Sequence, residues 1–289
     1  MKIYSYKVWF LALASLLVTT SCDKIEGPYL EEGGDSGGID TTIAELRKIL
    51  IEDFTGHTCG NCPRAAETAT SLKQLYSEQL VVIAVHMGFF AEPKSYPDSS
   101  YAYDFRTTMG DEIDAQFDID PTGLPKGMVN RTEVSGALLL SYSAWGSAAS
   151  VLSAMAPDVK MDISNAYDSQ TRTLTTTVIS DFLNNLSGTY NVVVALTEDN
   201  VVNWQKDYDL PAGQQDIENY VHQHVLRDGF TGTWGDQIAS GTVVAGTIDT
   251  STYTMVLPSS WNENECDVVA YVYETTSYEV LQVEESSIK

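Results

Sequence analysis

The stretch 53–63, which holds Cys59 and Cys62 three positions apart, most constrains what this chain can fold into. The apolar segment 49–51 precedes it, and residues 64–75 have the spacing of a helix. This order predicts a strand, a tight turn and a helix that begins at the cysteine pair. Unpaired N–H groups and the helix dipole favour a thiolate at such a position, and a thiolate is the nucleophile of disulfide exchange. The pattern therefore indicates redox chemistry.

The N-terminus reads as an export signal. Two lysines precede an apolar run over 8–18, which is too short to span a bilayer. Small residues then lead to Cys22, a pattern that resembles a bacterial lipobox, in which the cysteine is lipidated. We predict a lipoprotein signal peptide over 1–21 and a lipid anchor on Cys22. The alternative is an ordinary signal peptide followed by an incidental cysteine.

Residues 22–44 are rich in Gly, Asp and Glu, have no apolar periodicity, and are predicted to form a solvated acidic tether. The net charge of −24 becomes −26 once Lys2 and Lys7 leave with the signal. Such acidity argues against nucleic acid and anionic lipid as partners. The lipid would therefore hold the protein to a membrane.

The composition changes near residue 157, which favours two domains. Residues 45–157 alternate strand and helix patterns, including a buried parallel strand over 80–85 and a helix over 103–117. Residues 158–289 are dominated by strand patterns that favour an all-β immunoglobulin-like sandwich. The predicted strands are 159–164, 174–182, 190–196, 242–248, 253–257, 268–273 and 278–283.

Several residues of the first domain resemble those of thioredoxins. Asp53 and Phe54 stand at the family's distance before the first cysteine, and 116–119 resembles the segment before its cis-proline. The resemblance implies an α/β thioredoxin-like fold in which Pro125 is the cis-proline of a substrate-binding loop. Lys126 stands where a Thr is common, and this affects substrate specificity.

The pattern also assigns roles within the pair. Cys59 precedes the helix and is expected to be the more exposed, attacking cysteine, whereas Cys62 would resolve the mixed disulfide. The thioredoxin resemblance makes Asp53 a proton acceptor near Cys62. His57 either lines the mouth of the site and stabilises the thiolate when protonated, or is a solvent-facing loop residue.

The cysteine pair has three other possible interpretations. Zinc needs about four ligands, usually from two such pairs, and the sequence offers only one pair, so no metal or other cofactor is predicted. A structural disulfide suits an exported protein, although a loop this short constrains the unfolded chain little. A domain that keeps the fold without catalysis is the third alternative.

Three further residues have chemistry of interest. Cys266 begins a strand pattern and is interpreted as a small buried hydrophobe. His222 and His224 would share one face of a strand, a geometry that can hold a metal. No third ligand is obvious, so packing against the first domain or Trp234 is the favoured interpretation.

A wider resemblance rests on 54–63, 129–131 and 222–227. These segments resemble Bacteroidota outer-membrane lipoproteins known as the twenty-eight-kilodalton outer membrane protein family. The resemblance implies a thioredoxin-like domain followed by a β-rich domain. The resulting hypothesis is a thiol–disulfide oxidoreductase that acts on thiols or disulfides of envelope proteins. The alternative is a non-catalytic surface or envelope binding lipoprotein whose disulfide is structural.

Overall fold

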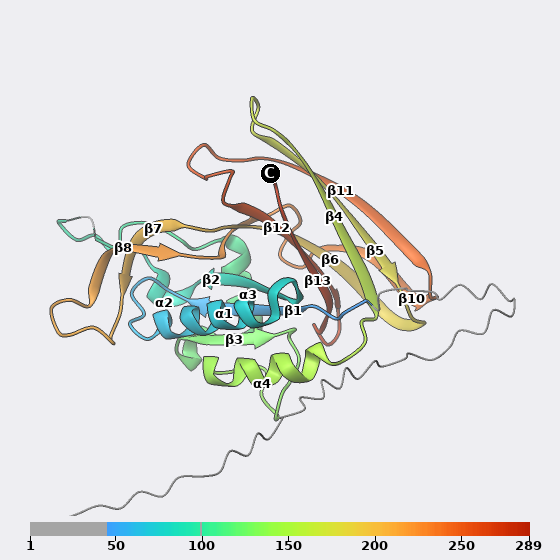
Figure 1. Ribbon diagram of the computed structural model, residues 1–289, viewed down its shortest axis with the longest axis horizontal. Helices are drawn as coiled ribbons and strands as arrows, with labels where there is room; N and C mark the ends of the chain where they lie inside the picture. Colours follow the sequence, from blue (N-terminus) through green and yellow to red (C-terminus); the bar gives the residue numbers. More distant parts are fainter. Residues whose placement is uncertain (1–44, 99) are drawn as a thin grey trace, which may run out of the picture. The chain divides into compact units, whose positions relative to one another are not determined.

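A mixed, eight-stranded β-sheet organises the chain in the computed structural model, which describes residues 45–98 and 100–289 (Figure 1). Its strand order is β13-β12-β6-β9-β2-β1-β3, and β10 also pairs with β6. The strands of this sheet are β1 (Ile49–Thr55), β2 (Leu80–His86), β3 (Lys126–Val129), β6 (Leu186–Glu198), β9 (Val225–Gly229), β10 (Asp236–Val243), β12 (Cys266–Glu274) and β13 (Val280–Ser287).

Helices cover the two faces of the part of the sheet formed by β1, β2 and β3. They are α1 (Cys62–Tyr76), α2 (Gly88–Ala91), α3 (Thr108–Phe117) and α4 (Tyr142–Ser153). Helix α1 joins the parallel strands β1 and β2. Its first turn contains Pro63, which is tolerated there because the first N–H groups of a helix have no intrahelical partner, so the missing N–H of proline costs no hydrogen bond. The hydroxyl oxygen of Thr107 caps α3 by accepting from the backbone N–H of Gly110 at 3.0 Å.

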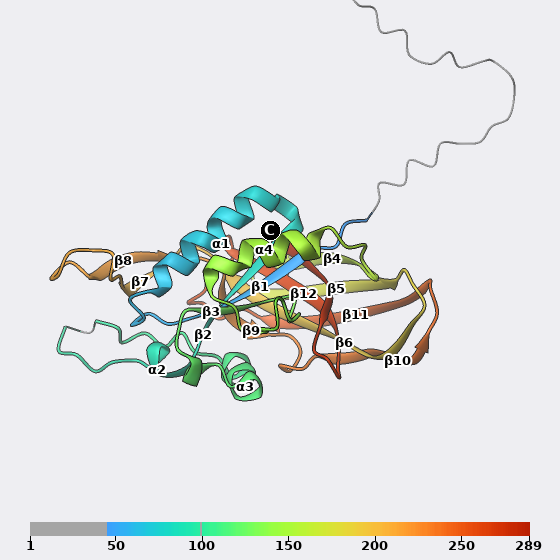
Figure 2. The ribbon, with the colours of Figure 1, turned by 90° about the horizontal axis from the view of Figure 1, so that it is seen from below.

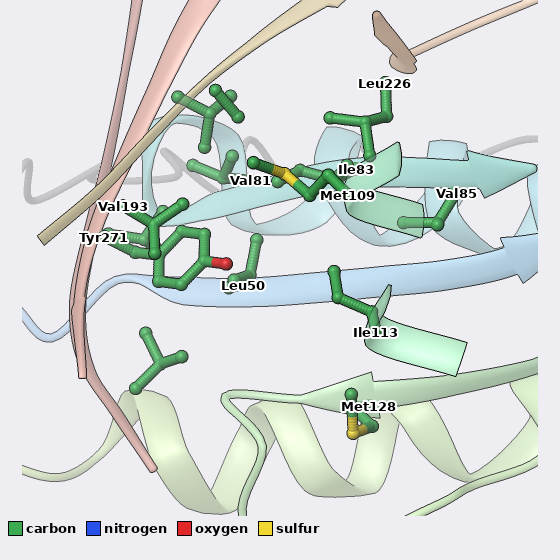
Figure 3. Close-up of a cluster of buried hydrophobic side chains, with 14 of the residues drawn as sticks. Leu50, Val81, Ile83, Val85, Met109, Ile113, Met128, Val193, Leu226 and Tyr271 are labelled. Atoms are coloured by element: carbon green, nitrogen blue, oxygen red, sulfur yellow. The ribbon is translucent and has the colours of Figure 1, made fainter. Parts of the chain in front are cut away.

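The period-two alternation of β1 determines which helices lie on which face. Ile49 and Ile51 pack with buried residues of α1 and α4, which lie side by side on that face (Figure 2). Leu50 belongs to the opposite cluster, which includes Met109 and Ile113 of α3 (Figure 3). This second cluster continues into β6, β9, β12 and β13.

A second sheet packs against the β6 and β12 end of the first (Figure 1). It consists of β4 (Val159–Asp168), β5 (Thr173–Phe182) and β11 (Thr247–Val256), in the order β11-β5-β4. Alternate residues such as Leu174, Val178 and Phe182 meet Val192 and Val194 of β6 in a buried cluster. This region is therefore two β-sheets packed face to face.

A two-stranded hairpin, β7 (Val201–Lys206) and β8 (Asp216–His222), stands apart from both sheets. Figures 1 and 2 both place it beside the N-terminal end of α1. Its position is fixed through β9, which pairs with β2 at Ala84 and Val225, where the Ala84 N–H also donates to the His224 carbonyl oxygen at 2.8 Å. A segment from late in the chain thereby reaches the cysteine pair.

One sheet joins the two segments that the sequence predicts as separate domains. Strands from 45–157 and from 158–289 share the large sheet, and Ala44–Lys289 form one compact unit. The boundary after residue 157 thus marks a change in composition within a continuous sheet, and independent folding of the two segments stays a prediction.

Element boundaries differ in several places. The predicted strand 242–248 is two strands, because Gly246, with φ 84°, forms the turn between β10 and β11. The hairpin strands β7 and β8 were not predicted as such, and α3 begins five residues later than expected. No helix in the described part of the chain has the length and apolar character needed to cross a membrane.

Candidate functional site

The disulfide between Cys59 and Cys62 lies where β1 ends and α1 begins, with the two Cα atoms 5.4 Å apart. The intervening turn is held by backbone hydrogen bonds: the Cys59 N–H donates to the Gly56 oxygen at 3.0 Å, and the Cys62 N–H to the Cys59 oxygen at 3.2 Å. Thr58 anchors the turn to α2, because its N–H and hydroxyl both donate to the Phe90 oxygen.

Both cysteines are only 2% exposed, so the expectation that Cys59 is the more exposed is wrong. The hairpin explains this burial. Backbone N–H groups of Lys206 and Tyr208 donate to the carbonyl oxygens of His57 at 2.8 Å and of Gly60 at 2.7 Å. These two hydrogen bonds hold the end of β7 and the residues after it against the cysteine turn.

Side chains of the hairpin complete this cover. The Gln205 Nε2 atom donates to the Cys59 carbonyl oxygen at 3.1 Å, and the Tyr208 ring lies on Gly60. A Cβ atom at Gly60 would come within 2.5 Å of that ring, so the packing requires glycine. At the rim, Arg64 of α1 forms an exposed ion pair with Asp209.

Asp53 of β1 is buried beneath this turn, 2% exposed. Its Oδ1 atom has no hydrogen-bond partner among the described residues, and burial raises the pKa of the carboxyl from 3.8 to about 8. A carboxyl with this pKa is mostly protonated at neutral pH and releases its proton within the range where thiols titrate. It is thus suited to exchange protons with a sulfur atom.

A cavity of about 430 Å³ reaches Asp53 and Cys62. Cys59 is not part of its described lining. The wall on one side is α1, the base is β2, and the other wall is the end of the hairpin. The lining residues that the chemistry concerns are Asp53, Cys62, Glu67, His86, Gln205 and His222.

Three histidines surround the buried side of the site. His57 is 1% exposed and its Nε2 atom lies 3.3 Å from the Glu92 carbonyl oxygen, which contradicts the solvent-facing interpretation. Burial lowers the pKa of His57 and of His222 to about 4 and that of His86 well below 6.5. All three rings are therefore neutral at neutral pH, and His57 carries no charge with which to stabilise a thiolate there.

The loop that leads into β3 agrees with the proline prediction. The Leu124–Pro125 peptide bond is cis, and Lys126 follows as the first residue of β3, paired with Phe54 at the end of β1. The register thus places Pro125 beside the strand end from which the chain turns toward the cysteines. Roles for Pro125 and Lys126 in substrate binding stay predictions.

An aromatic groove lies on the hairpin's other side. This second cavity, about 470 Å³, is lined by Phe89, Tyr96, Tyr101, Trp204 and Tyr208 together with charged residues, and it borders Thr58. Phe89, Tyr96 and Tyr208 are each more than half exposed. Such rings combine a large apolar area with, for tyrosine, a polar end, a composition suited to binding.

The remaining predicted residues lie elsewhere. His222 packs its ring on His86, 5.4 Å between centroids, as the packing interpretation expects, whereas His224 turns away with φ 55° and approaches Asp199. The two therefore do not share one strand face. No group of three or more His, Cys, Asp or Glu side chains in residues 45–98 and 100–289 is arranged to hold a metal.

Cys266 is buried at the start of β12, as predicted, and its thiol donates to the Asn262 carbonyl oxygen at 3.3 Å. Burial raises the pKa of this thiol to about 12, so it is unreactive at neutral pH. Cys22, the predicted lipidation site, lies outside the described residues.

Sequence reasoning missed His86, Gln205 and Tyr208. His86 ends a parallel strand, and ligands of open α/β sheets gather at that edge, so its position carried a usable signal. Gln205 and Tyr208 carried none, because they are more than 140 residues from the cysteines they cover.

Comparison with known proteins gives a family and a few structures. Residues 111–289 match the family described as outer membrane protein Omp28. An Agrobacterium tumefaciens protein of known crystal structure is 14% identical in sequence to this chain. The match covers 85% of this chain and 96% of that chain, with a TM-score of 0.49. A domain of the outer membrane lipoprotein Omp28 from Porphyromonas gingivalis is 20% identical, with coverage of 46% and 89% and a TM-score of 0.32. No curated protein matches the sequence.

Proposed function

The chain belongs to the outer membrane protein Omp28 family, and we propose that this outer-membrane protein exchanges thiols and disulfides with envelope proteins through Cys59 and Cys62. Membership confirms the resemblance found in the sequence and gives the location, the outer membrane of the cell envelope. The exchange activity is the proposal.

The observation that carries it is the juxtaposition of the disulfide with the buried carboxyl of Asp53, whose Oδ1 atom has no hydrogen-bond partner among the described residues. Asp53 and Cys62 line one cavity, and the pKa of Asp53 is raised to about 8 by burial. Perturbed carboxyls in a cleft are concentrated at functional sites. A disulfide at a helix start, a strand-helix-strand unit and cis-Pro125 support a thioredoxin-like architecture for residues 45–157.

In the proposed reaction, the thiolate of one reduced cysteine attacks a partner disulfide, forms a mixed disulfide and releases one partner thiol. The other cysteine then attacks the mixed disulfide and releases the second partner thiol, so the pair is oxidised and the partner is reduced; the reverse reaction oxidises a partner dithiol. The N-terminus of α1 stabilises whichever sulfur leaves as a thiolate. Asp53 would take up and return the proton at Cys62. Lipidation of Cys22 would tether the protein to the membrane, and the face-to-face sheets would form an immunoglobulin-like spacer.

The aromatic groove favours a second candidate, the binding lipoprotein with a structural disulfide. Its exposed rings offer a contact surface, and the hairpin keeps the disulfide out of solvent. In that case the exchange activity is absent and the groove carries the function.

The test of exchange is a trapping experiment. Cys62→Ser leaves Cys59 as a free thiol, and we expect it to accumulate mixed disulfides with envelope proteins, seen as reducible high-mass bands. Cys266→Ala is the matched control, because that thiol is buried and outside the pair.

A redox titration of the wild type separates the two candidates. A catalytic pair should have a reduction potential above about −270 mV, whereas structural disulfides usually lie below about −300 mV. A value in the structural range, combined with no trapped partner and no turnover of a model disulfide, contradicts exchange and leaves the binding candidate.

A further inference from the structure

The hairpin covers the Cys59 side of the disulfide. The carbonyl oxygens of His57 and Gly60 are already bonded to the N–H groups of Lys206 and Tyr208. The Arg64–Asp209 ion pair holds the connection between β7 and β8, and the hydrogen bond from the Tyr101 hydroxyl to Asp216 Oδ1, at 2.6 Å, holds the start of β8. A protein partner reaches Cys59 only after the hairpin moves.

The Cys62 side is different, because a cavity leads to it. At about 430 Å³ the cavity is within the range of roughly 300–1,000 Å³ typical of small-molecule sites, and it is far too small for a folded partner. It lies between α1 and the end of β8, above β2. Cys62 belongs to the described lining of this cavity, and Cys59 does not.

The chemistry of the lining indicates a polar occupant. Asp53 is 98% buried, lines the cavity, and has an Oδ1 atom without a partner among the described residues. Buried polar atoms are rarely left unpaired, so Asp53 is available to form a hydrogen bond with water or with a polar ligand in the cavity. Glu67 adds a second carboxyl to the cavity, and the described lining includes no lysine or arginine to attract an anion.

We propose that this cavity admits a low-molecular-weight thiol, neutral or cationic rather than anionic, which attacks the Sγ atom of Cys62. The inference rests on the proposed exchange function and names its small-molecule substrate class. It divides access to the pair: small thiols reach Cys62 through the cavity, and proteins reach Cys59 only when the hairpin opens.

The reaction balances as two thiol–disulfide exchanges. A thiolate RS⁻ attacks Cys62, the Cys59–Cys62 bond breaks, and Cys59 leaves as a thiolate at the start of α1. A second RS⁻ attacks the sulfur of R in the mixed disulfide, releasing RSSR and the Cys62 thiolate. Two thiols are oxidised, the protein disulfide is reduced by two electrons, and the two cysteines gain the two protons that the thiols lost.

The test measures second-order reduction rates of the full chain with cysteamine, 2-mercaptoethanol and 3-mercaptopropionate, and with a reduced thioredoxin. Each rate is divided by that of an unfolded peptide bearing residues 57–64, which removes differences in thiol reactivity. We expect the normalised rate to fall from cysteamine to 3-mercaptopropionate, and to be lowest for the protein dithiol.

Two variants locate the routes. Ala66→Phe fills the cavity and should lower the cysteamine rate about tenfold, whereas Gln74→Phe, exposed on the same helix and outside the cavity, should leave it unchanged. Tyr208→Ala loosens the hairpin and should raise only the thioredoxin rate. Circular dichroism and thermal unfolding verify that each variant folds.

The outcomes distinguish the two levels of the hypothesis. A folded Ala66→Phe protein with the wild-type cysteamine rate, or a native disulfide that thioredoxin reduces faster than every small thiol, overturns the cavity route while exchange stands. A native disulfide that none of these reductants reduces until the protein unfolds overturns the exchange function itself.

Discussion

On one face of β1, Glu52 is buried and forms an ion pair with Arg131, whereas on the other face Asp53 is equally buried and its Oδ1 atom has no partner among the described residues. Arg131 donates to both Glu52 oxygens, at 2.7 and 2.8 Å, and to the Tyr271 hydroxyl at 2.9 Å. Hydrogen bonds and the opposite charge of Arg131 thus satisfy the Glu52 carboxylate, whereas the Asp53 carboxyl lines a cavity beside the disulfide.

The difference separates a structural acid from a candidate functional one. A buried charge is tolerated when hydrogen bonds and an opposite charge satisfy it, as at Glu52. A buried carboxyl without such partners becomes protonated instead, as the raised pKa of Asp53 indicates. Glu52 and Asp53 thus have opposite roles, because successive side chains of a strand face opposite ways.

The largest expected effect comes from breaking the paired side. Arg131→Met leaves the Glu52 charge buried alone and should lower the free energy of unfolding by about 3–5 kcal/mol, measured by urea denaturation. The double variant with Glu52→Leu should recover most of the loss. Equal instability of the single and double variants would show that volume, not charge, controls this site.

Asp53→Asn tests the unpaired side through pH. Because the folded-state pKa of about 8 lies above the unfolded value of 3.8, the folded protein binds more protons between these pH values, and wild-type stability falls as pH rises. The stability of Asp53→Asn relative to wild type should therefore grow by up to about 1.4 kcal/mol per pH unit, or about 2–3 kcal/mol from pH 5 to 7. Above pH 8 the difference should be constant. A pH-independent difference contradicts the raised pKa.

Tyr271→Phe removes one donor–acceptor contact from the paired side while leaving the ion pair in place. A hydrogen bond to a charged group contributes about 1.5 kcal/mol, so we expect the free energy of unfolding, measured by urea denaturation, to fall by about this amount. Tyr273→Phe, whose hydroxyl instead donates to the Trp234 carbonyl oxygen, is the matched control for a neutral hydrogen bond. A loss at Tyr271 no larger than at Tyr273 would weaken the role given to Arg131.

The smallest stability effect is expected at the exposed ion pair. Arg64→Ala should leave global unfolding unchanged, because solvent-exposed pairs contribute little. It should nevertheless increase hydrogen exchange at the Lys206 and Tyr208 amides, which bond to the cysteine turn. Unchanged exchange at both amides would mean that the hairpin does not depend on this pair.

Local pattern predicted a substantial part of the fold. The apolar runs gave β1 and β2, the spacing after Pro63 gave α1, and Leu124–Pro125 is cis as the resemblance implied. These features depend on residues close in sequence. Cys266 was likewise placed correctly, because it begins an apolar strand pattern.

Features that depend on distant residues were not predicted. The hairpin that covers the disulfide follows from the pairing of β9 with β2, which carries residues 201–222 to the cysteines. The prediction that Cys59 is the more exposed cysteine was wrong for this reason, and so was the prediction that His222 and His224 share one strand face. Such long-range strand pairing leaves no periodic signal in either partner.

By itself, the sequence determined the strand–turn–helix unit that holds Cys59 and Cys62, since local hydrophobic periodicity and the proline position suffice to specify it. Only the tertiary structure decided that Cys59 is covered and that Cys62 borders a cavity that also reaches Asp53, whose Oδ1 atom has no partner within the described part of the chain. The physical reason is that accessibility and hydrogen-bond satisfaction are properties of the whole packed chain.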